Sequence, residues 1–370
     1  MKTTRKQTRG VLCFVIGVML LCGMGQSALA CEACSVTRQD VTVSSRFAEL
    51  FFGRSRDERH TQDDAPTDDT VRYLCPGGEV FGVKIATDDV VICDVESADS
   101  CLRVGDRILS VDGVQVRAAA DVMQAVRACD GTLSMTILRD GREHTLEVTP
   151  DGTDGNYRLG ITLRDGTAGI GTVTFVDPET GIFGGLGHGI CDAETGEILS
   201  MREGIVTEVT LGGVKKGESG KPGELHGVLR NTATGVLFKN CACGVFGRLH
   251  PLKSTKDAIP VATRDEVHEG DATILSTVHS GEPCAFAITI RDIDYQSDGT
   301  KSFTVEVTDP ALIAMTGGIV RGMSGSPIIQ DGKLVGAVTH VMVADPTEGY
   351  GIFIENMLNS AQSQAIPKAA

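Results

Sequence analysis

The chain has 370 residues and a formal net charge of -15 at pH 7, with 45 glycines, four tyrosines and no tryptophan. This length allows about two folded units, each with its own core. The acidic balance argues against a nucleic-acid partner, because phosphate binding needs clustered lysine and arginine side chains. The glycine content favours a turn-rich β protein over a helical bundle.

The first thirty residues have the pattern of an export signal. Basic residues in "MKTTRKQTRG" precede an apolar run and the small-residue stretch "QSALAC", which suits a signal peptidase. The apolar run spans about 20 residues, which is also enough for an uncleaved membrane anchor. We therefore expect residues 1–30 to be a signal peptide or a membrane anchor. Either way, the bulk of the chain is expected to be extracytoplasmic.

Residues 31–70 are expected to form a charged linker, because their second half is hydrophilic and has no apolar periodicity. Cysteine pairs occur in "CEAC" (31–34) and in "CAC" (241–243). No second CxxC motif and no paired histidines complete a zinc set, so neither a metal nor another cofactor is predicted.

Residues 71–150 have the element order of a small α+β domain. The patterns predict strands in "VKIATDDVVICDVE", a hairpin in "GDRILSVDGVQV", a helix in "AAADVMQAVRACDG" and a hairpin around Asp140-Gly141. This order, with "LRVGDRILSVDG" inside it, resembles a PDZ domain.

The PDZ resemblance implies that an extended peptide binds as an added strand and that a glycine-containing loop catches its C-terminal carboxylate. The matching segment is "GGEVFG", and its loop residues are Gly77, Gly78, Val80, Phe81 and Gly82. The alternative is a degenerate PDZ domain that only packs against its neighbour.

Residues 156–366 are expected to form a β domain. Short strands are interrupted by glycine, Asp-Gly and proline turns, as in "GITLRDGTAGIGTVTFVDPETGIFGGLGHGICD". Many short strands at this spacing predict a β-barrel or a sandwich. Only the tail, "IENMLNSAQSQ", has the pattern of a helix. The expected fold class is therefore mainly β.

The segment "GMSGSP" has the outline of the nucleophile loop of chymotrypsin-type peptidases, with Ser324 as the nucleophile. Gly322 can adopt backbone angles that direct its own N–H and that of Ser324 into one pocket for the oxyanion. The alternative is a glycine-rich start of a β-hairpin without any chemistry.

A serine nucleophile needs a base and a group that orients the base. His188 lies between two glycines in "GGLGHGICD", where its ring can stand exposed at a strand end. The rival base is His340, although its alternating strand position suits a core histidine. Asp309, in "VTDPAL", is the first choice for the orienting acid, and Asp292 and Asp294 compete with it. The alternative role for Asp309 is an Asp-Pro turn that caps a strand.

Three long blocks follow the apolar segment and the PDZ-like unit in order: "TAGIGTVTFVDPETGIFGGLGHGI", "GIVRGMSGSPIIQDGKLVGAVTHV" and "DPTEGYGIFIENML". With them the chain resembles the stage IV sporulation protein B (SpoIVB) peptidase family from Val71 to about Ser360. The resemblance implies a chymotrypsin-like double β-barrel with His188, Asp309 and Ser324 as the catalytic residues.

The resemblance also implies a self-cleaving serine endopeptidase of endospore formation, exported across or anchored to the forespore membrane and facing the intermembrane space. Its protein substrates would be its own N-terminal region and a membrane-bound regulator of an intramembrane protease that activates a mother-cell sigma factor. The competing hypothesis is a non-catalytic PDZ-containing protein that binds or tethers a partner in the same space.

Overall fold

The computed structural model describes residues 71–97, 100–152, 157–193, 195–250, 257–279 and 281–362. The predicted signal peptide or anchor and the predicted linker lie outside these residues. The described part is mainly β, as the sequence predicts. None of the helices in these described ranges is long and apolar enough to cross a membrane.

The elements follow one another along the chain with short connections. The first strands are β1 (Tyr73–Pro76), β2 (Val80–Val95), β3 (Arg107–Val111), β4 (Val114–Gln115), β5 (Leu133–Arg139) and β6 (Arg142–Val148). The next are β7 (Ile161–Val176), β8 (Ile182–Gly185), β9 (Glu203–Lys215), β10 (Glu224–Cys241), β11 (Gly244–Leu249) and β12 (Ile259–Pro260). The last are β13 (Gly270–Ser276), β14 (Cys284–Arg291), β15 (Phe303–Val307), β16 (Pro327–Gln330), β17 (Lys333–Val341) and β18 (Glu348–Phe353). The helices are α2 (Ala119–Ala128), α3 (Pro310–Thr316), α4 (Ile354–Gln362) and the 3₁₀ turn η1 (Arg264–Glu266).

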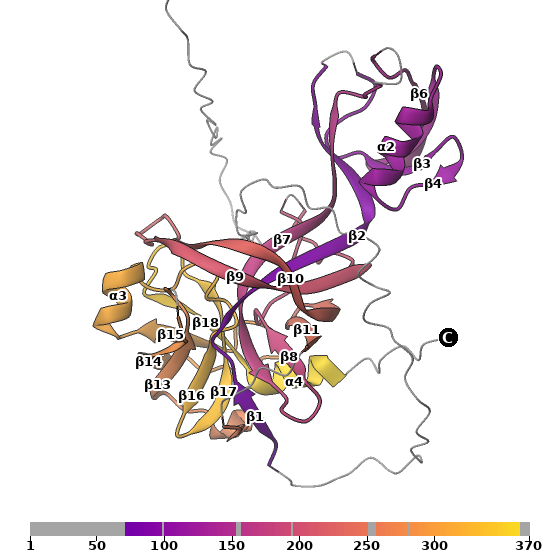
Figure 1. The fold of residues 1–370 in the computed structure, drawn as a ribbon. Coiled ribbons are helices and arrows are strands. Elements are labelled where there is room, and N and C mark those ends of the chain that lie inside the picture. The colour runs from indigo at the N-terminus through magenta and orange to yellow at the C-terminus, as the bar shows by residue number, and fades with distance from the viewer. Residues whose placement is uncertain are drawn as a thin grey trace, which may run out of the picture. The chain divides into compact units, whose positions relative to one another are not determined.

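The C-terminal strands close into a barrel in the order β13-β14-β15-β18-β17-β16 (Figure 1). Branched and aromatic side chains at alternating positions fill its interior, because successive residues of a strand point to opposite faces. Fully buried members of this core include Ile274, Ile288, Val305, Phe303 and Phe353. The turn between β16 and β17 is the Asp-Gly turn that the sequence predicts, with both residues at positive φ.

A second ring of six strands precedes this barrel. Strand β2 pairs with β7, β7 with β8, β8 with β11, β11 with β10, β10 with β9, and β9 again with β2. Its core contains Phe81, Ile85, Phe183 and Val245. The ring therefore closes through a strand, β2, that lies far earlier in the chain than the others.

In the sequence, the PDZ-like domain is inserted between two strands of this ring, β2 and β7. Residues 82–86 of β2 pair with β9, whereas Val90 and Val91 of the same strand pair with β3 of the PDZ-like sheet. Strand β7 is shared in the same way, with residues 161–164 in the PDZ-like sheet and 166–172 in the ring. The sequence analysis assigns residues 71–150 to a PDZ domain. In the structure, however, β1 and the first half of β2 pair with strands of the following domain.

The PDZ-like core contains the two predicted hairpins and the predicted helix. Helix α2 buries Val122 and Val126, which lie one turn apart on the same face. Met123, the next apolar residue after Val122, is 49% exposed, because it lies about 100° further around the helix.

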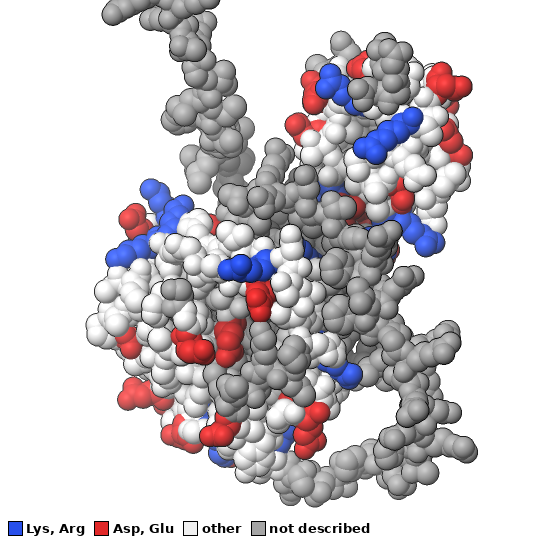
Figure 2. Space-filling view, viewed as in Figure 1, with Lys and Arg blue, Asp and Glu red and all other residues white. Residues whose placement is uncertain are grey.

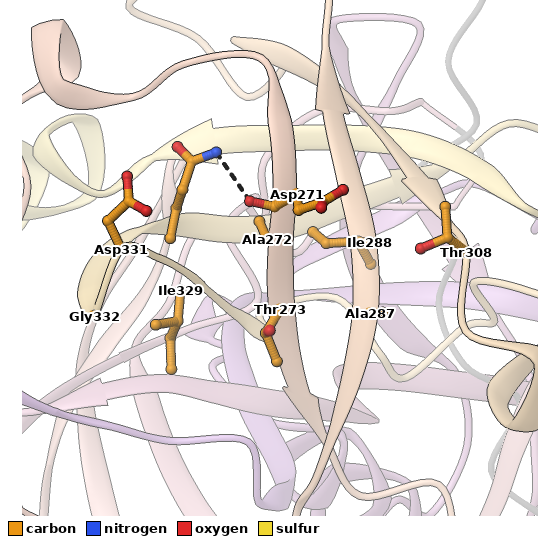
Figure 3. A pocket seen from close by; sticks show the side chains of 10 residues that line it. Asp271, Ala272, Thr273, Ala287, Ile288, Thr308, Ile329, Asp331 and Gly332 are labelled. Atoms are coloured by element: carbon orange, nitrogen blue, oxygen red, sulfur yellow. Dashed lines mark hydrogen bonds between the residues drawn. The ribbon is translucent and has the colours of Figure 1, made fainter.

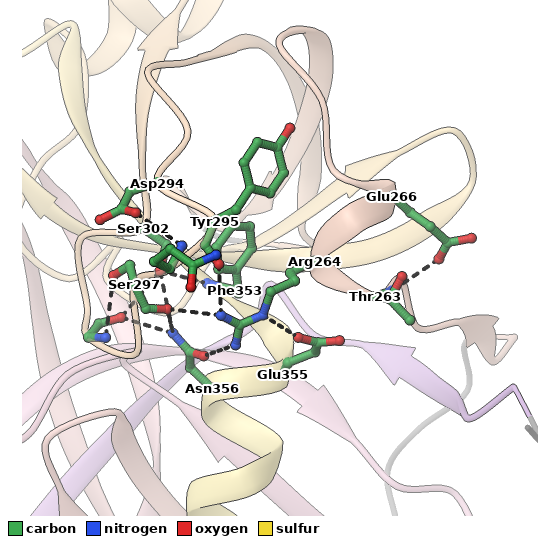
Figure 4. A network of polar contacts seen from close by, with 12 residues as sticks. Thr263, Arg264, Glu266, Asp294, Tyr295, Ser297, Ser302, Phe353, Glu355 and Asn356 are labelled. Carbon is green, nitrogen blue, oxygen red and sulfur yellow. Dashed lines mark hydrogen bonds and ion pairs between the residues drawn. The ribbon is translucent and has the colours of Figure 1, made fainter. Parts of the chain in front are cut away.

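A polar network fixes the C-terminal helix to the second barrel (Figure 4). The Arg264 guanidinium donates to the carboxylate of Glu355 at 2.8 Å and to the side-chain oxygen of Asn356 at 3.0 Å. It also donates to the carbonyl of Tyr295 and lies 5.4 Å from the centre of the Phe353 ring. One side chain thus joins η1, the loop after β14, the end of β18 and the start of α4.

On the face drawn in Figure 2, acidic side chains are scattered over the described surface, and lysine and arginine side chains form small separate groups between them. Acidic and basic side chains are therefore interspersed on that face.

Candidate active site

The loop that carries Ser324 is held between β7 and β17 by its backbone. The N–H of Gly325 donates to the carbonyl of Val338 at 2.7 Å, and the carbonyl of Ser324 accepts from the N–H of Thr172 at 3.0 Å. The buried hydroxyl of Thr174 donates to the carbonyl of Gly325 at 2.8 Å. These bonds tie the nucleophile loop to both barrels.

The close packing of the nucleophile loop on β7 requires a glycine at position 325. Its φ is +95°, and a Cβ atom at this position would lie 2.1 Å from the carbonyl oxygen of Thr172. No side chain can be accommodated there without moving the backbone of β7 or of the loop. The glycine after the serine therefore brings the loop against β7.

The two amides predicted for the oxyanion hole belong to Gly322 and Ser324. Gly322 has a φ of +98°, and its carbonyl accepts a hydrogen bond of 2.8 Å from the buried hydroxyl of Thr172. Among the described residues, neither the N–H of Gly322 nor that of Ser324 donates to a backbone carbonyl. Both amides therefore remain available to an acceptor from outside the chain.

The half-buried hydroxyl of Ser324 donates a hydrogen bond of 2.7 Å to the carbonyl of Thr339 in β17. A carbonyl can accept this bond but cannot take the proton. In this arrangement the hydroxyl is held next to the residue that precedes His340.

His188 lies in the loop after β8, between Gly187 and Gly189. Its Nδ1 is 2.9 Å from the carbonyl oxygen of Gly189. Because a carbonyl only accepts, Nδ1 must carry a proton in this contact, and whenever the ring is neutral Nε2 is the nitrogen that can accept one. Gly187 has a φ of +69°, and a Cβ there would lie 2.9 Å from the Cγ2 of Thr339, so this loop packs directly on β17.

His340 lies beside His188. The two ring centres are 4.9 Å apart, with an angle of 33° between the ring planes. Burial, followed by the nearby charges of His188 and Lys301, lowers the pKa of His340 to about 3. A base with so low a pKa takes up a proton poorly at neutral pH, so the structure disfavours His340 as the rival base.

Asp309 lies at a helix N-terminus, not at the strand-capping turn that the sequence suggests. Its carboxylate accepts hydrogen bonds from the backbone N–H groups of Ala311, Leu312 and Ala287. The N–H of Leu312, and then those of Ala287 and Ala311, lower the pKa of Asp309, while the small burial opposes them. These contacts make Asp309 the N-cap of α3, with Pro310 in the first turn, and the hydrogen bonds of its carboxylate go to backbone N–H groups and not to His188.

The predicted peptide-binding loop at residues 77–82 is also placed differently from the prediction. The N–H groups of Gly77 and Gly78 donate to the carbonyls of Thr174 and Val173 in β7, at 2.9 and 2.8 Å. Phe81 is buried in the ring. The amides of Gly77 and Gly78 are thus engaged with β7, an arrangement that does not support the carboxylate capture that the PDZ resemblance implies.

An unpaired strand edge does occur elsewhere in the PDZ-like sheet. Among the strands that the structure describes, only β2 pairs with residues 161–164 of β7. Ile161 and Leu163 pack against the PDZ-like core, and the N–H of Ala119 at the start of α2 donates to the carboxylate of Asp165. The sequence signal for this edge is the Leu159-Gly160 pair before alternating residues, with Gly160 at positive φ.

An open pocket of about 540 Å³ lies on the second barrel (Figure 3). Its lining comes from β13, β14, β16 and the residues that follow β15 and β16: Asp271, Ala272, Thr273, Ala287, Ile288, Thr308, Ile329, Gln330, Asp331 and Gly332. None of the predicted catalytic residues lines it. The pocket is therefore separate from the site formed around Ser324.

Curated proteins with similar sequences cover only part of this chain. The protein mll0638 of Mesorhizobium japonicum, named as a zinc metalloprotease, is 33% identical over 81 residues, which are 22% of each chain. Atu1380 of Agrobacterium fabrum, also named as a zinc metalloprotease, is 27% identical over 154 residues, or 39% of each chain. This chain thus spans well under half of either relative. Across its described residues, no group of three or more His, Cys, Asp or Glu side chains is placed to hold a metal ion.

Solved structures give a distant likeness. The Rv3671c protease from M. tuberculosis, in its active form, is 13% identical, with 55% of this chain and 78% of that chain covered and a TM-score of 0.31. The HtrA-type protease AlgW with a decapeptide is 11% identical, with 77% and 63% covered and a TM-score of 0.34. A likeness at these TM-scores does not establish a common fold.

Family models match almost the whole described chain. A PDZ domain model matches residues 80–149, and the SpoIVB peptidase S55 model matches residues 155–358, more than half of the chain. The second match includes the segments of both His188 and Ser324. The chain therefore belongs to the SpoIVB peptidase S55 family and is a serine endopeptidase.

Proposed function

We propose that the protein is a serine endopeptidase in which Ser324 is the nucleophile and His188 the general base. The observation that carries this proposal is the meeting of two distant segments on β17. The Ser324 hydroxyl bonds to the Thr339 carbonyl, and the His188 ring packs on the His340 ring, one residue further along the strand. This meeting supports the assignment of Ser324 and His188 as the nucleophile and the base.

The chemistry follows from the protonation state of His188. Because Nδ1 donates to Gly189, Nε2 is the atom that takes the Ser324 proton as Oγ attacks the scissile carbonyl. The N–H groups of Gly322 and Ser324 stabilise the oxyanion, and Nε2 then gives the proton to the leaving amine. Water hydrolyses the acyl-enzyme by the same steps. Before the first step, the Ser324 side chain must rotate away from Thr339.

The two closed rings of strands support a chymotrypsin-like arrangement, in which a catalytic site lies between two six-stranded barrels. His188 follows β8 of the first ring and Ser324 precedes β16 of the second. The role of Asp309 as a third catalytic residue stays a prediction from the resemblance, and its contacts as a helix cap do not support it.

The wider role that we propose rests on the family. The protein acts outside the cytoplasm during endospore formation, cleaves its own N-terminal region and cleaves a membrane-bound regulator of an intramembrane protease. A substrate segment in extended form fits the open strand edge at residues 161–164, since the next strand of a sheet binds through main-chain hydrogen bonds. This edge replaces the loop at residues 77–82 as the proposed binding site.

A second candidate function is non-catalytic binding of a membrane partner. The observation that favours it is the hydrogen bond from Ser324 to Thr339, which holds the hydroxyl on an acceptor that cannot activate it. The same open strand edge would serve a tethering protein equally well.

The deciding experiment follows purified residues 31–370 over time on a gel and by intact-mass analysis, beside Ser324→Ala and His188→Ala. We expect the unmutated chain to shorten and both variants to remain intact. Equal shortening of all three assigns the cut to a contaminating protease. If none shortens and a peptide library is also left uncut, the binding function replaces the peptidase function.

A further inference from the structure

The ring of His340 is a fixed surface beside the proposed base. His340 pairs with Tyr350 across the β17–β18 ladder, so its backbone belongs to the closed barrel. The His188 ring, by contrast, comes from a loop after β8. A tilted ring contact joins the two, with the ring centres 4.9 Å apart and 33° between the ring planes. The rigid partner in this contact is therefore His340.

The charge of His340 is also settled by its surroundings. The charged or titratable groups that act on it are His188 and Lys301, and the Lys301 ammonium lies 4.4 Å from the centre of the Tyr350 ring. Both neighbours disfavour a second positive charge, and burial does so even more strongly, which gives His340 its pKa of about 3. The ring is therefore neutral around pH 7.

We propose that His340 is a positioning residue whose ring sets the plane of the His188 ring, so that Nε2 faces the Ser324 hydroxyl when that hydroxyl leaves Thr339. This inference rests on the proposed peptidase function. The hydrogen bond from Nδ1 to Gly189 holds one edge of the His188 ring. The His340 ring, with its centre 4.9 Å from that of His188, packs against it and restricts the second torsion, which is broad in histidine side chains in general.

A second observation makes it possible to test whether His340 acts through the packing of its ring or through its nitrogen atoms. The Nδ1 atom of His340 is buried and has no hydrogen-bond partner among the described residues. A buried polar atom without a partner destabilises the fold. Phenylalanine offers the same flat face without that atom. If packing is what His340 contributes, His340→Phe keeps the function and raises the melting temperature.

The test compares His340→Phe with His340→Leu, which fills a similar volume but has no flat face. Ser324 is labelled with a fluorophosphonate, and the maximal labelling rate and the half-saturating concentration are measured separately. We expect the leucine variant to lose roughly 10- to 100-fold in maximal rate, since about 1 Å of misplacement costs about 100-fold. The half-saturating concentration should not change, and the phenylalanine variant should label within about threefold of the unmutated protein.

Two labelling outcomes overturn the inference. Full labelling of the leucine variant shows that the ring does not position the base. A phenylalanine variant as slow as the leucine variant shows that the nitrogen atoms, and not the flat face, are what His340 contributes.

A spectroscopic measurement keeps the inference distinct from the proposed function. Imidazole ¹H–¹⁵N spectra report whether His188 holds its proton on Nδ1. We expect one Nδ1-protonated form in the unmutated and phenylalanine proteins, and a mixture of tautomers in the leucine protein. Unlabelled Ser324 in the unmutated protein would reject the peptidase function alone. An unchanged His188 signal in the leucine protein would reject the positioning role, whatever the activity.

Discussion

The hydroxyl of Ser324 is bonded to the carbonyl of Thr339, and the next side chain of that strand, His340, packs against the proposed base. The proposed nucleophile and the proposed base thus both contact β17, the first through the carbonyl of Thr339 and the second through the ring of His340. In the proposed mechanism, the Ser324 hydroxyl must rotate from the Thr339 carbonyl to Nε2 of His188 before it can react.

Replacing Gly325 by alanine is expected to displace the nucleophile loop, because the new Cβ would lie 2.1 Å from the Thr172 carbonyl oxygen at a φ of +95°. Labelling of Ser324 by a fluorophosphonate should be lost. The matched control is Gly332→Ala, which has a φ of +75° and no atom within 4 Å of the added Cβ. That control should lower the free energy of unfolding by roughly 1–2 kcal/mol and leave labelling intact. Equal labelling of both variants would show that the close approach to Thr172 is not needed.

Asp309→Asn is expected to keep α3 capped and to keep most of the activity, because an asparagine oxygen can accept the same backbone hydrogen bonds. Asp309→Ala should lower the free energy of unfolding by about 1 kcal/mol. Urea denaturation and fluorophosphonate labelling measure the two effects. A loss of about 100-fold or more in labelling by the asparagine variant, at unchanged stability, would restore Asp309 as the acid that orients His188.

Arg264→Met is expected to lower the free energy of unfolding by roughly 1–3 kcal/mol, because Glu355, Asn356 and the Tyr295 carbonyl lose a charged donor. The control is Lys333→Met, which breaks an exposed ion pair with Glu266 and should change the stability little. Urea denaturation of both variants makes the comparison. If the two variants unfold at the same urea concentration, the network of Figure 4 does not hold α4 in place.

His268 is expected to titrate above the usual range for histidine. Its Nε2 lies 2.8 Å from the Asp331 carboxylate, which is the main cause of its raised pKa, and the carbonyl of Glu269 adds to it. Because the folded pKa is raised, the stabilisation is fully present below the unfolded pKa of about 6.5 and is lost as the pH rises through the folded pKa. An NMR titration should show a lower midpoint for His268 in Asp331→Asn. An unchanged midpoint would mean that this exposed pair does not form in solution.

Local patterns in the sequence predict the turns and the loop of Ser324 well. The Asp-Gly pairs at 140–141 and 331–332 form the hairpin turns that they predict, and the glycines around Ser324 lie at positive φ. These features depend on residues within one or two positions of each other. The alternating pattern of β2 likewise predicts a strand, but it contains no information on which sheet pairs with each half of it.

Asp309 and His188 differ in how much of their environment the local sequence can predict. The motif "TDPAL" is also typical of a helix N-cap followed by proline, and this local signal identifies the cap at Asp309. No local signal indicates that the Gly189 carbonyl orients His188 or that His340 packs on it. Those contacts exist only after β17 has joined the second barrel and the loop after β8 has met it.

The sharing of β2 and β7 between two sheets affects the order in which the chain folds. The first ring cannot close until β11 has been synthesised, whereas the PDZ-like sheet is complete once residue 164 has left the ribosome. If the PDZ-like domain folds first, it places β2 and β7 side by side and in register. The ring can then form without the entropic cost of closing the long chain segment between these two strands. Pulsed hydrogen exchange during refolding should then find the PDZ-like amides protected before those of β9 and β10. In that case the inserted domain acts as a template for the barrel that holds His188, the proposed base.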